Sequence, residues 1–278
     1  MIELIPDHAD AHYNRGRAYF IKDNVDQAIT DFTTAIQLNP NDTKIYSVRG
    51  AAYCKKGNFD SAIADLNTAI KLSRNDGNAY HNRGSAHHQK GNVEKAIKDY
   101  TKAIELEPNF AILYYDRGIA YYQKGELDKA IPDYTKAIEL KPDYAEAYCN
   151  RGGTYSIKGE LEKTIKDCNQ AIKLKPDYAD AYCNRGVAYY RKGDFDNAIR
   201  DYTKAIELKP DYAEAYCNRG EAWLHLQEWE KAKADLTTAQ NMGVDIIASF
   251  HNEYKSVEEF EQKIGIQLPP DIAEILMQ

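Results

Sequence analysis

The sequence predicts an all-α protein made of a row of antiparallel helix pairs. The first observation is internal repetition, because residues 130–152 and 198–220 lie 68 positions apart and differ only at Pro132 and Arg200. The second is that this distance is twice 34 residues, a step that the whole chain keeps and that is typical of helical arrays. The third is that each 34-residue copy holds two stretches of helical apolar spacing with a turn between them.

Seven consecutive units follow this step. They are expected at residues 9–42, 43–76, 77–110, 111–144, 145–178, 179–212 and 213–246. Such a unit buries its apolar face only against its neighbours, so the units are expected to form one array and not separate domains. Residues 1–8 match the end of a unit's second helix, which indicates the remnant of a preceding repeat. Either the natural start codon truncated a repeat or the chain is a fragment of a longer array, and the second alternative is favoured.

The fourth unit shows why a helix pair forms. Gly125 follows the first apolar stretch and is placed to end the first helix as a C-cap glycine. A second apolar stretch begins at Ala130, and Pro142 stops it. Gly118, Ala130 and Ala137 are small, and two helices approach closely only where side chains are short. The unit therefore predicts two closely packed helices joined by a short turn.

This repeat resembles the tetratricopeptide repeat, whose pattern places aromatic, glycine, alanine and proline residues at fixed positions. In the fourth unit the matching residues are Tyr114, Gly118, Tyr121, Ala130, Tyr134, Ala137 and Pro142. The resemblance covers roughly residues 9–245. It implies a right-handed superhelical solenoid of antiparallel helix pairs, in which the first helices of the units line a concave groove that holds extended or helical peptides.

Two units depart from the repeat pattern in informative ways. The unit 43–76 lacks the closing proline and has Ser73 to Asp76 in its place, so its junction with the next unit is expected to be the softest. In the seventh unit, Lys233 and Gln240 stand where the other six units have isoleucine. A last repeat whose outer face meets water or a different element would show this change.

Residues 247–278 leave the repeat pattern and are expected to form a C-terminal helical cap, which a repeat array needs for solubility. Ser256 and Glu259 make a capping box that would open one helix. A last short helix is expected after Leu268, with Ile272 and Leu276 on its apolar face. The alternative is that this segment is a separate partner-binding element.

Two positions of the repeat hold the same charged residue in all seven units. The seventh position is Arg15, Arg49, Arg83, Arg117, Arg151, Arg185 and Arg219, and the twenty-third is Asp31, Asp65, Asp99, Asp133, Asp167, Asp201 and Asp235. This recurrence predicts structural ion pairs between the two helices, because a planar guanidinium meets a carboxylate with two hydrogen bonds. The alternative is that the arginines bind a ligand. Pairing within a repeat and pairing across a junction both stay open.

The resemblance also implies which side chains face the groove. The expected peptide-binding residues are Ile112, Tyr115, Ile119, Tyr122, Cys149, Asn150, Gly153, Ser156, Asn184, Tyr190 and Asn218. Those of the fourth unit form an uninterrupted apolar stripe. The small residues of the fifth unit predict a hollow between Tyr122 of the fourth unit and Val187 and Tyr190 of the sixth. The alternative is that the tyrosines only pack against one another. The recurring asparagines are expected to hydrogen-bond a ligand backbone.

Charge is expected to orient the ligand along the groove. Lys44 and Lys55 make the first end basic, whereas Glu214 and Glu221 make the far end acidic against Arg191. A ligand that is acidic towards Lys44 and basic towards Glu214 would match this distribution.

Composition disfavours several classes of function. The chain has 36 Lys and Arg against 43 Asp and Glu, a net charge of −7, which disfavours nucleic-acid binding. No apolar run approaches the length of a membrane span, and the first residues do not look like a secretory leader. Three of the five cysteines, Cys149, Cys183 and Cys217, occupy one position of successive units. Equivalent helices lie about 8–10 Å apart, too far for a disulfide, so free thiols and a cytoplasmic location are expected.

These observations favour a protein-protein interaction scaffold that binds a peptide or protein segment of unknown identity in the groove. No catalytic motif is visible, so the chain is not expected to be an enzyme, and neither a cofactor, a metal ion, nucleic acid nor membrane insertion is expected. Homo-oligomerisation through the exposed N-terminal end is also open. The alternative function is a non-catalytic regulatory or assembly module cut from a larger multidomain protein, with the partner bound through the C-terminal tail.

Overall fold

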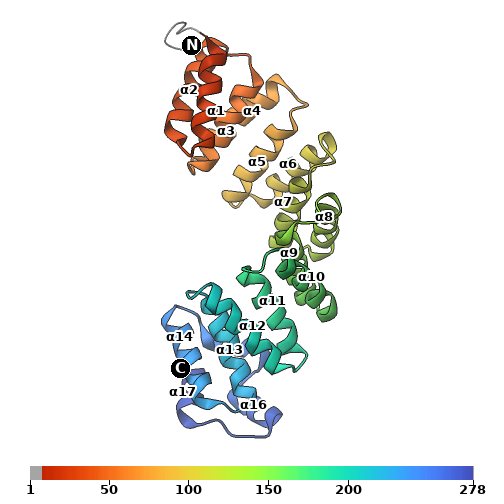
Figure 1. Cartoon of the computed structure of the whole chain (residues 1–278), viewed down its shortest axis with the longest axis vertical. Coiled ribbons are helices and arrows are strands. Elements are labelled where there is room, and N and C mark those ends of the chain that lie inside the picture. The colour runs from red at the N-terminus through yellow and green to blue at the C-terminus, as the bar shows by residue number, and fades with distance from the viewer. Residues whose placement is uncertain (1–7, 278) are drawn as a thin grey trace. The chain divides into compact units, whose positions relative to one another are not determined.

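The computed structural model describes residues 8–277, except for the side chains of residues 252 and 253. Within this range every regular element is a helix, from α1 to α17, and the expected all-α fold class is confirmed. The chain divides into two compact units, Met1–Pro142 and Asp143–Gln278, whose helices Figure 1 labels. The expected remnant at residues 1–8 lies outside the described residues except for His8.

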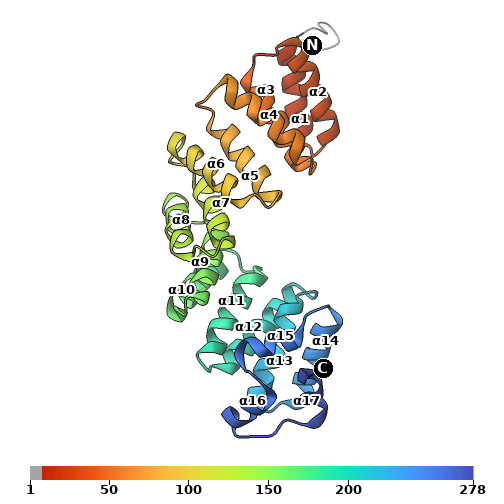
Figure 2. The same cartoon turned by 180° about the vertical axis from the view of Figure 1, so that it is seen from behind.

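The first unit contains four antiparallel helix pairs, which Figure 2 shows from the other side. Its helices are α1 (Ala9–Ile21), α2 (Val25–Leu38), α3 (Thr43–Lys55), α4 (Phe59–Leu72), α5 (Gly77–Gln89), α6 (Val93–Leu106), α7 (Ala111–Gln123) and α8 (Leu127–Leu140). The first helix of each pair begins at the first residue of an expected repeat. The second helices α2, α4 and α6 also pack on the first helix of the next pair, α3, α5 and α7 respectively.

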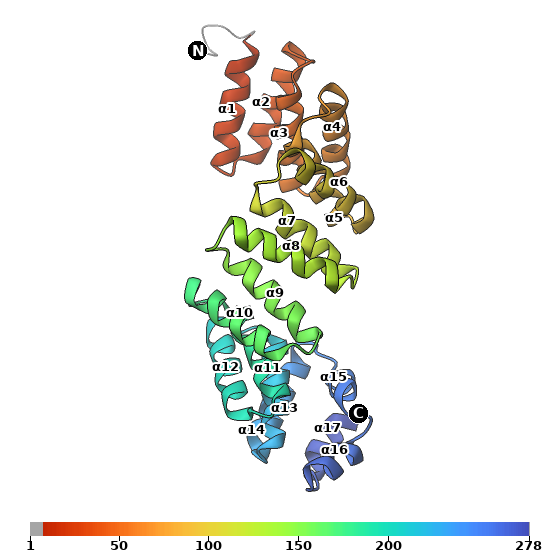
Figure 3. The same ribbon diagram turned by 90° about the vertical axis from the view of Figure 1, so that its right-hand side faces the viewer.

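The second unit contains three further helix pairs and the C-terminal tail, and Figure 3 shows both. The paired helices are α9 (Ala145–Ile157), α10 (Leu161–Leu174), α11 (Ala179–Arg191), α12 (Phe195–Leu208), α13 (Ala213–His225) and α14 (Trp229–Asn241). The tail consists of α15 (Ile246–Glu253), α16 (Val257–Ile264) and α17 (Pro270–Met277). Neighbouring first helices, α9 with α11 and α11 with α13, lie against each other.

A glycine in each first helix receives a large side chain from the second helix. A Cβ added to Gly118 would lie 2.7 Å from Cε1 of Tyr134, and one added to Gly186 would lie 2.7 Å from Cε1 of Tyr202. Both tyrosines are 1% exposed. Any larger residue at these glycines would push the two helices of the pair apart, which explains why the repeat needs glycine there.

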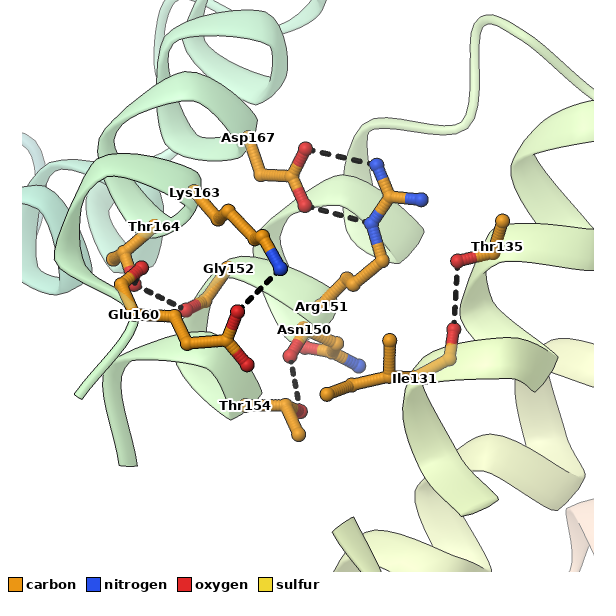
Figure 4. Close-up of polar contacts among 10 residues, drawn as sticks. All are labelled: Ile131, Thr135, Asn150, Arg151, Gly152, Thr154, Glu160, Lys163, Thr164 and Asp167. Atoms are coloured by element: carbon orange, nitrogen blue, oxygen red, sulfur yellow. Dashed lines mark hydrogen bonds and ion pairs between the residues drawn. The ribbon is translucent and has the colours of Figure 1, made fainter. Parts of the chain in front are cut away.

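The fifth repeat keeps this contact with different chemistry. Cys168 replaces the aromatic residue, and its Sγ lies 3.1 Å from the position that a Cβ on Gly152 would take. Thr164 replaces alanine, and its hydroxyl donates to the Gly152 carbonyl at 3.1 Å, as Figure 4 shows. The smaller core is thus held by a hydrogen bond between α9 and α10.

The junction without a closing proline is held by side-chain hydrogen bonds. Asp76 is the N-cap of α5 and accepts from the Ala79 amide at 3.0 Å. Its second oxygen accepts from the Ser47 hydroxyl of α3 at 2.7 Å. Asp76 thus links the neighbouring first helices α3 and α5 where other repeats have a proline turn. The expected softness of this junction stays a prediction.

The recurring arginine and aspartate lie within hydrogen-bond distance in all seven repeats. In each, the arginine Nε donates to aspartate Oδ2 and Nη2 donates to Oδ1, over distances of 2.6 to 2.9 Å. Figure 4 shows this arrangement for Arg151 and Asp167. Each pair joins the first helix of a repeat to its second helix, so the pairing lies within repeats.

The third nitrogen of the same guanidinium reaches the preceding repeat. Nη1 of Arg49 donates to Thr33 Oγ1 at 3.0 Å, and Nη1 of Arg117 donates to Thr101 Oγ1 at 3.1 Å. The corresponding bonds elsewhere are Arg83 to Asn67, Arg185 to Asn169 and Arg219 to Thr203. One arginine therefore fixes the geometry inside its repeat and across the junction before it.

Tyrosines of the first helix shield the ion pair from water. The guanidinium of Arg117 lies 5.9 Å from the ring centroid of Tyr114 and 5.8 Å from that of Tyr121. The Arg117 side chain is 17% exposed, whereas Arg15 in the first repeat is 45% exposed. Burial lowers the pKa of Arg117, but the hydrogen bond to Asp133 and the negative charge of that carboxylate together outweigh burial, so the pKa is raised.

The tail forms a helical cap on the seventh repeat, as the sequence predicts. Phe250, Phe260 and Leu276 are each 1% exposed or less and share one core with Leu236 of α14. Ser256 accepts from the Glu259 amide at 3.2 Å and so caps α16. The rings of Phe250 and Phe260 are therefore buried against α13 and α14.

The seventh repeat differs from the others where it meets this cap. Lys233 of α14, which replaces isoleucine, lies with its Nζ 2.5 Å from Oδ2 of Asp271 in α17. The expectation that its outer face meets a different element is confirmed.

His225 at the end of α13 joins the repeats to the tail. Its Nε2 lies 3.1 Å from the Tyr190 hydroxyl of α11 and 2.9 Å from the Tyr254 hydroxyl after α15. Its ring stacks on Phe195, with 4.2 Å between the centroids. Burial, together with the positive charge of Lys263, lowers the pKa of His225 to about 4.

We expect Arg117→Leu to destabilise the first unit by about 3–5 kcal/mol, because the buried Asp133 carboxylate would lose its partner. Replacing Asp133 by leucine as well should recover much of this free energy. Arg15→Leu is the matched control and should cost less, since the Arg15 side chain is 45% exposed. Urea unfolding measures all three variants. If Arg117→Leu lowered the free energy of unfolding by only about 0.5 kcal/mol, as an ordinary surface substitution does, the structural role would be contradicted.

We expect the stability of the second unit to fall as the pH decreases from 6.5 towards 4. The pKa of His225 is lowered from 6.5 to about 4 in the folded chain, so the unfolded chain takes up the proton first in this interval. The contribution is complete above pH 6.5 and is lost as the pH approaches 4. His225→Phe keeps a ring beside Phe195 but does not titrate. Its thermal midpoint should therefore depend less on pH than that of the parent, and equal slopes would contradict this assignment.

Candidate functional site

The expected apolar stripe lies on α7 of the first unit. Ile112 and Tyr122, at its two ends, are 41% and 40% exposed. Tyr115 and Ile119 between them are half-buried. The Tyr115 ring packs against the buried Tyr134, with 6.1 Å between the ring centroids. The middle of the stripe is therefore packed against the core of the repeat, and the apolar side chains at its two ends are exposed to solvent.

The small residues expected to leave a hollow are partly covered within the second unit. Cys149 is 1% exposed, and Asn184 Nδ2 donates to its Sγ at 3.4 Å. The same amide nitrogen would lie 3.3 Å from a Cβ on Gly153. Ser156 is buried, and its carbonyl accepts from Arg191 Nη1 at 2.7 Å. Cys149 and Ser156 are therefore buried next to side chains of α11, and their contact with a ligand stays a prediction. A hollow that also involves Tyr122 stays a prediction.

The recurring asparagines make hydrogen bonds inside the array. Besides the bond from Asn184, Asn218 Nδ2 lies 4.0 Å from Cys183 Sγ in the preceding repeat. The main-chain carbonyl of Asn150 accepts from the Thr154 hydroxyl at 2.7 Å (Figure 4). The side chains of Asn150, Asn184 and Asn218 are half-buried. Asn184 and Asn218 therefore join neighbouring repeats, and contact of the three asparagines with a ligand backbone stays a prediction.

A pocket of about 270 Å³ opens between α11 and α13 of the second unit. It is lined from α11 by Val187, Tyr190 and Arg191 and from α13 by Glu214, Asn218 and Glu221. Ser249 of α15 also lines it. The structure thus brings the expected site residues Tyr190 and Asn218 into one hollow.

Glu221 is the buried carboxylate of this pocket. It is 8% exposed, and its Oε1 accepts from the Ser249 hydroxyl at 3.0 Å. Cys217 Sγ lies 3.7 Å from the same oxygen. The sequence pointed to Glu221 through its charge, but it gave no sign of Ser249, since only the docking of the tail brings α15 beside α13.

The basic end of the expected groove is partly neutralised. Lys55 Nζ lies 2.5 Å from Asp23 Oδ1, so this lysine is engaged within the first unit. Lys44 lines a polar pocket of about 620 Å³ together with Asp42 and Asp76. Two carboxylates beside Lys44 weaken the positive potential that the sequence predicted there.

The cysteines and His81 are engaged within the fold. All five cysteines are free thiols. Burial raises the pKa of Cys54 to about 11 and that of Cys149 to about 12, so both stay protonated at neutral pH. His81 Nε2 lies 2.6 Å from Asp116 Oδ2 in the next repeat. Among residues 8–277, no three or more His, Cys, Asp or Glu side chains gather as a metal site requires.

None of the described helices, α1 to α17, combines the length and the apolar character that a membrane crossing requires.

Family models match most of the chain. A model described as "TPR repeat" matches residues 50–91, 84–125, 120–156 and 154–193. A model described as "Tetratricopeptide repeat" matches residues 9–42 and 179–212. A search of curated proteins found no match.

Solved structures with the same fold include three that cover well over half of the chain. YrrB, described as a TPR protein with an unusual peptide-binding site, is 25% identical with a TM-score of 0.59, over 71% of this chain and 97% of its own. MamA is 32% identical with a TM-score of 0.56, over 62% of this chain and 94% of its own. A tetratricopeptide repeat protein from Parabacteroides merdae is 20% identical with a TM-score of 0.66, over 97% and 99% of the two chains, and shows the fold alone.

Proposed function

Because the chain belongs to the tetratricopeptide repeat family, we propose that it is a protein-interaction scaffold that binds a peptide or an extended protein segment along the face of its first helices. The observation that carries this proposal is the apolar stripe on α7, where Ile112 and Tyr122 are exposed beside the supported Tyr115. The peptide-binding site named for YrrB supports this use of the fold.

Aromatic side chains on a rigid helix suit this role. Tyrosine anchors dominate many interfaces because they bury a large area with little loss of conformational freedom. Burying one apolar partner side chain against the stripe would contribute about 1.5–3 kcal/mol. The acidic residues of α13 would mainly set the orientation and the association rate of the ligand.

The proposal includes no catalytic step. The buried thiols stay protonated, and His81 and His225 are engaged with neighbouring side chains. Five free thiols fit a reducing compartment such as the cytoplasm. The acidic net charge of −7 favours a protein or peptide partner over nucleic acid.

The alternative of partner binding through the tail receives less support. The aromatic side chains that would have anchored a partner there, Phe250 and Phe260, are each 1% exposed. The tail instead contributes Ser249 to the pocket between α11 and α13.

We expect Tyr115→Ala combined with Tyr122→Ala to weaken peptide binding by about tenfold or more, because two anchors leave the stripe. The probe is a peptide selected on the parent chain from a random phage-displayed library, and titration calorimetry measures its Kd. Leu38→Ala with Leu72→Ala is the matched control, since these exposed side chains end the second helices α2 and α4. Unchanged affinity in the tyrosine variant, with the fold intact by circular dichroism, would exclude the α7 stripe as the site.

A further inference from the structure

The pocket between α11 and α13 differs in chemistry from the apolar stripe on α7. Two carboxylates, Glu214 and Glu221, and the carboxamide of Asn218 line it from α13. Tyr190 lines it from α11. Its volume of about 270 Å³ is enough for one long side chain. An acidic, partly aromatic hollow of this size is suited to one specific side chain of a bound segment.

Glu221 provides a fixed acceptor in this pocket. It is only 8% exposed, and Ser249 donates to one of its oxygens at 3.0 Å. A carboxylate has about four acceptor sites on its two oxygens. A positively charged donor compensates a buried carboxylate far better than a neutral group does. Glu221 therefore favours a cationic occupant.

Arg191 is a cation that also lines the pocket, and its Nη1 donates to the Ser156 carbonyl of α9 at 2.7 Å. Glu214 lies at the exposed mouth of the pocket, and Glu221 lies deeper. A cationic side chain that enters would thus meet a carboxylate at the mouth and a second one inside.

The tyrosine of the pocket adds a second attraction for a cation. Cations are drawn to the face of an aromatic ring within about 6 Å of its centroid. The second unit uses this contact repeatedly, with Arg185 5.5 Å from the Tyr182 centroid and Lys209 4.6 Å from the Tyr212 centroid. Tyr190 is held in place by its hydrogen bond to His225.

We propose that this pocket is a specificity subsite that binds one arginine or lysine side chain of the partner segment, with Glu221 and Glu214 as the charged acceptors and Tyr190 beside them. This inference rests on the proposed peptide-binding function and states the chemistry of one position of the ligand. It also gives the tail a part in recognition, because Ser249 of α15 orients the Glu221 carboxylate.

The test selects random phage-displayed peptides in parallel on three proteins. These are the parent chain, the variant E214Q/E221Q, and the control E207Q/E228Q, whose glutamates are exposed and lie outside the pocket. Glutamine at position 221 can still accept from Ser249, so the fold should persist, and thermal unfolding checks this. The parent and the control should enrich arginine or lysine at one peptide position, and the pocket variant should not.

A second measurement uses one selected peptide in which citrulline replaces arginine. Citrulline keeps the shape and removes the charge, so we expect the Kd on the parent to rise by about tenfold or more. Equal affinity of both peptides, or the same basic preference on E214Q/E221Q, would overturn the subsite. Peptides that depend on Tyr115 and Tyr122 without any basic preference would overturn the subsite and leave the proposed function standing. Failure to select any peptide on the parent would overturn both.

Discussion

The ion pair between arginine and aspartate is the interaction on which the rest of this structure depends. Nε and Nη2 of Arg117 hold Asp133 of the same repeat, and Nη1 holds Thr101 of the preceding one. Lysine could not replace arginine there, because its single ammonium lacks the planar fork that meets a carboxylate and a third acceptor together. Asp133 is 6% exposed, and removing a buried ion pair from water offsets much of the free energy that the pair gains. The main effect of the pair is therefore to hold every repeat in the same geometry.

A second constraint is the offset between neighbouring first helices. Contacts recur between residues that are 35 positions apart, as in His81 with Asp116, Asn184 with Cys149 and Tyr190 with His225. The separation is one residue longer than the 34-residue repeat. A residue in these contacts therefore touches the next repeat one position after its own equivalent. This offset brings some of the side chains that a single helix would present to a ligand into the contact between repeats, as it does for Cys149 and Asn184.

This offset explains how far the sequence could predict the structure. The helix starts, the glycine contacts and the existence of the arginine pairs follow from features that recur in each 34-residue copy, whereas the placement of each pair within its repeat needed the structure. The burial of Cys149 does not follow from these features either, because it depends on Asn184 in the next copy. The same holds for ion pairs between repeats, such as Lys56 with Asp26 at 2.6 Å, which are exposed and contribute little. Of the site, the α7 stripe was predictable, whereas the pocket needed the docked tail.

The tail contacts residues on both helices of the seventh repeat. Lys233 pairs with Asp271 of α17, Glu221 accepts from Ser249 of α15, and His225 lies 2.9 Å from the Tyr254 hydroxyl. A simple end cap would contact only the outer surface of α14, the second helix of the seventh repeat. Here residues of α13, on the face that holds the pocket, also contact the tail. The tail therefore does more than keep water from α14, since it fixes the carboxylate and, through His225, the tyrosine that define the pocket between α11 and α13.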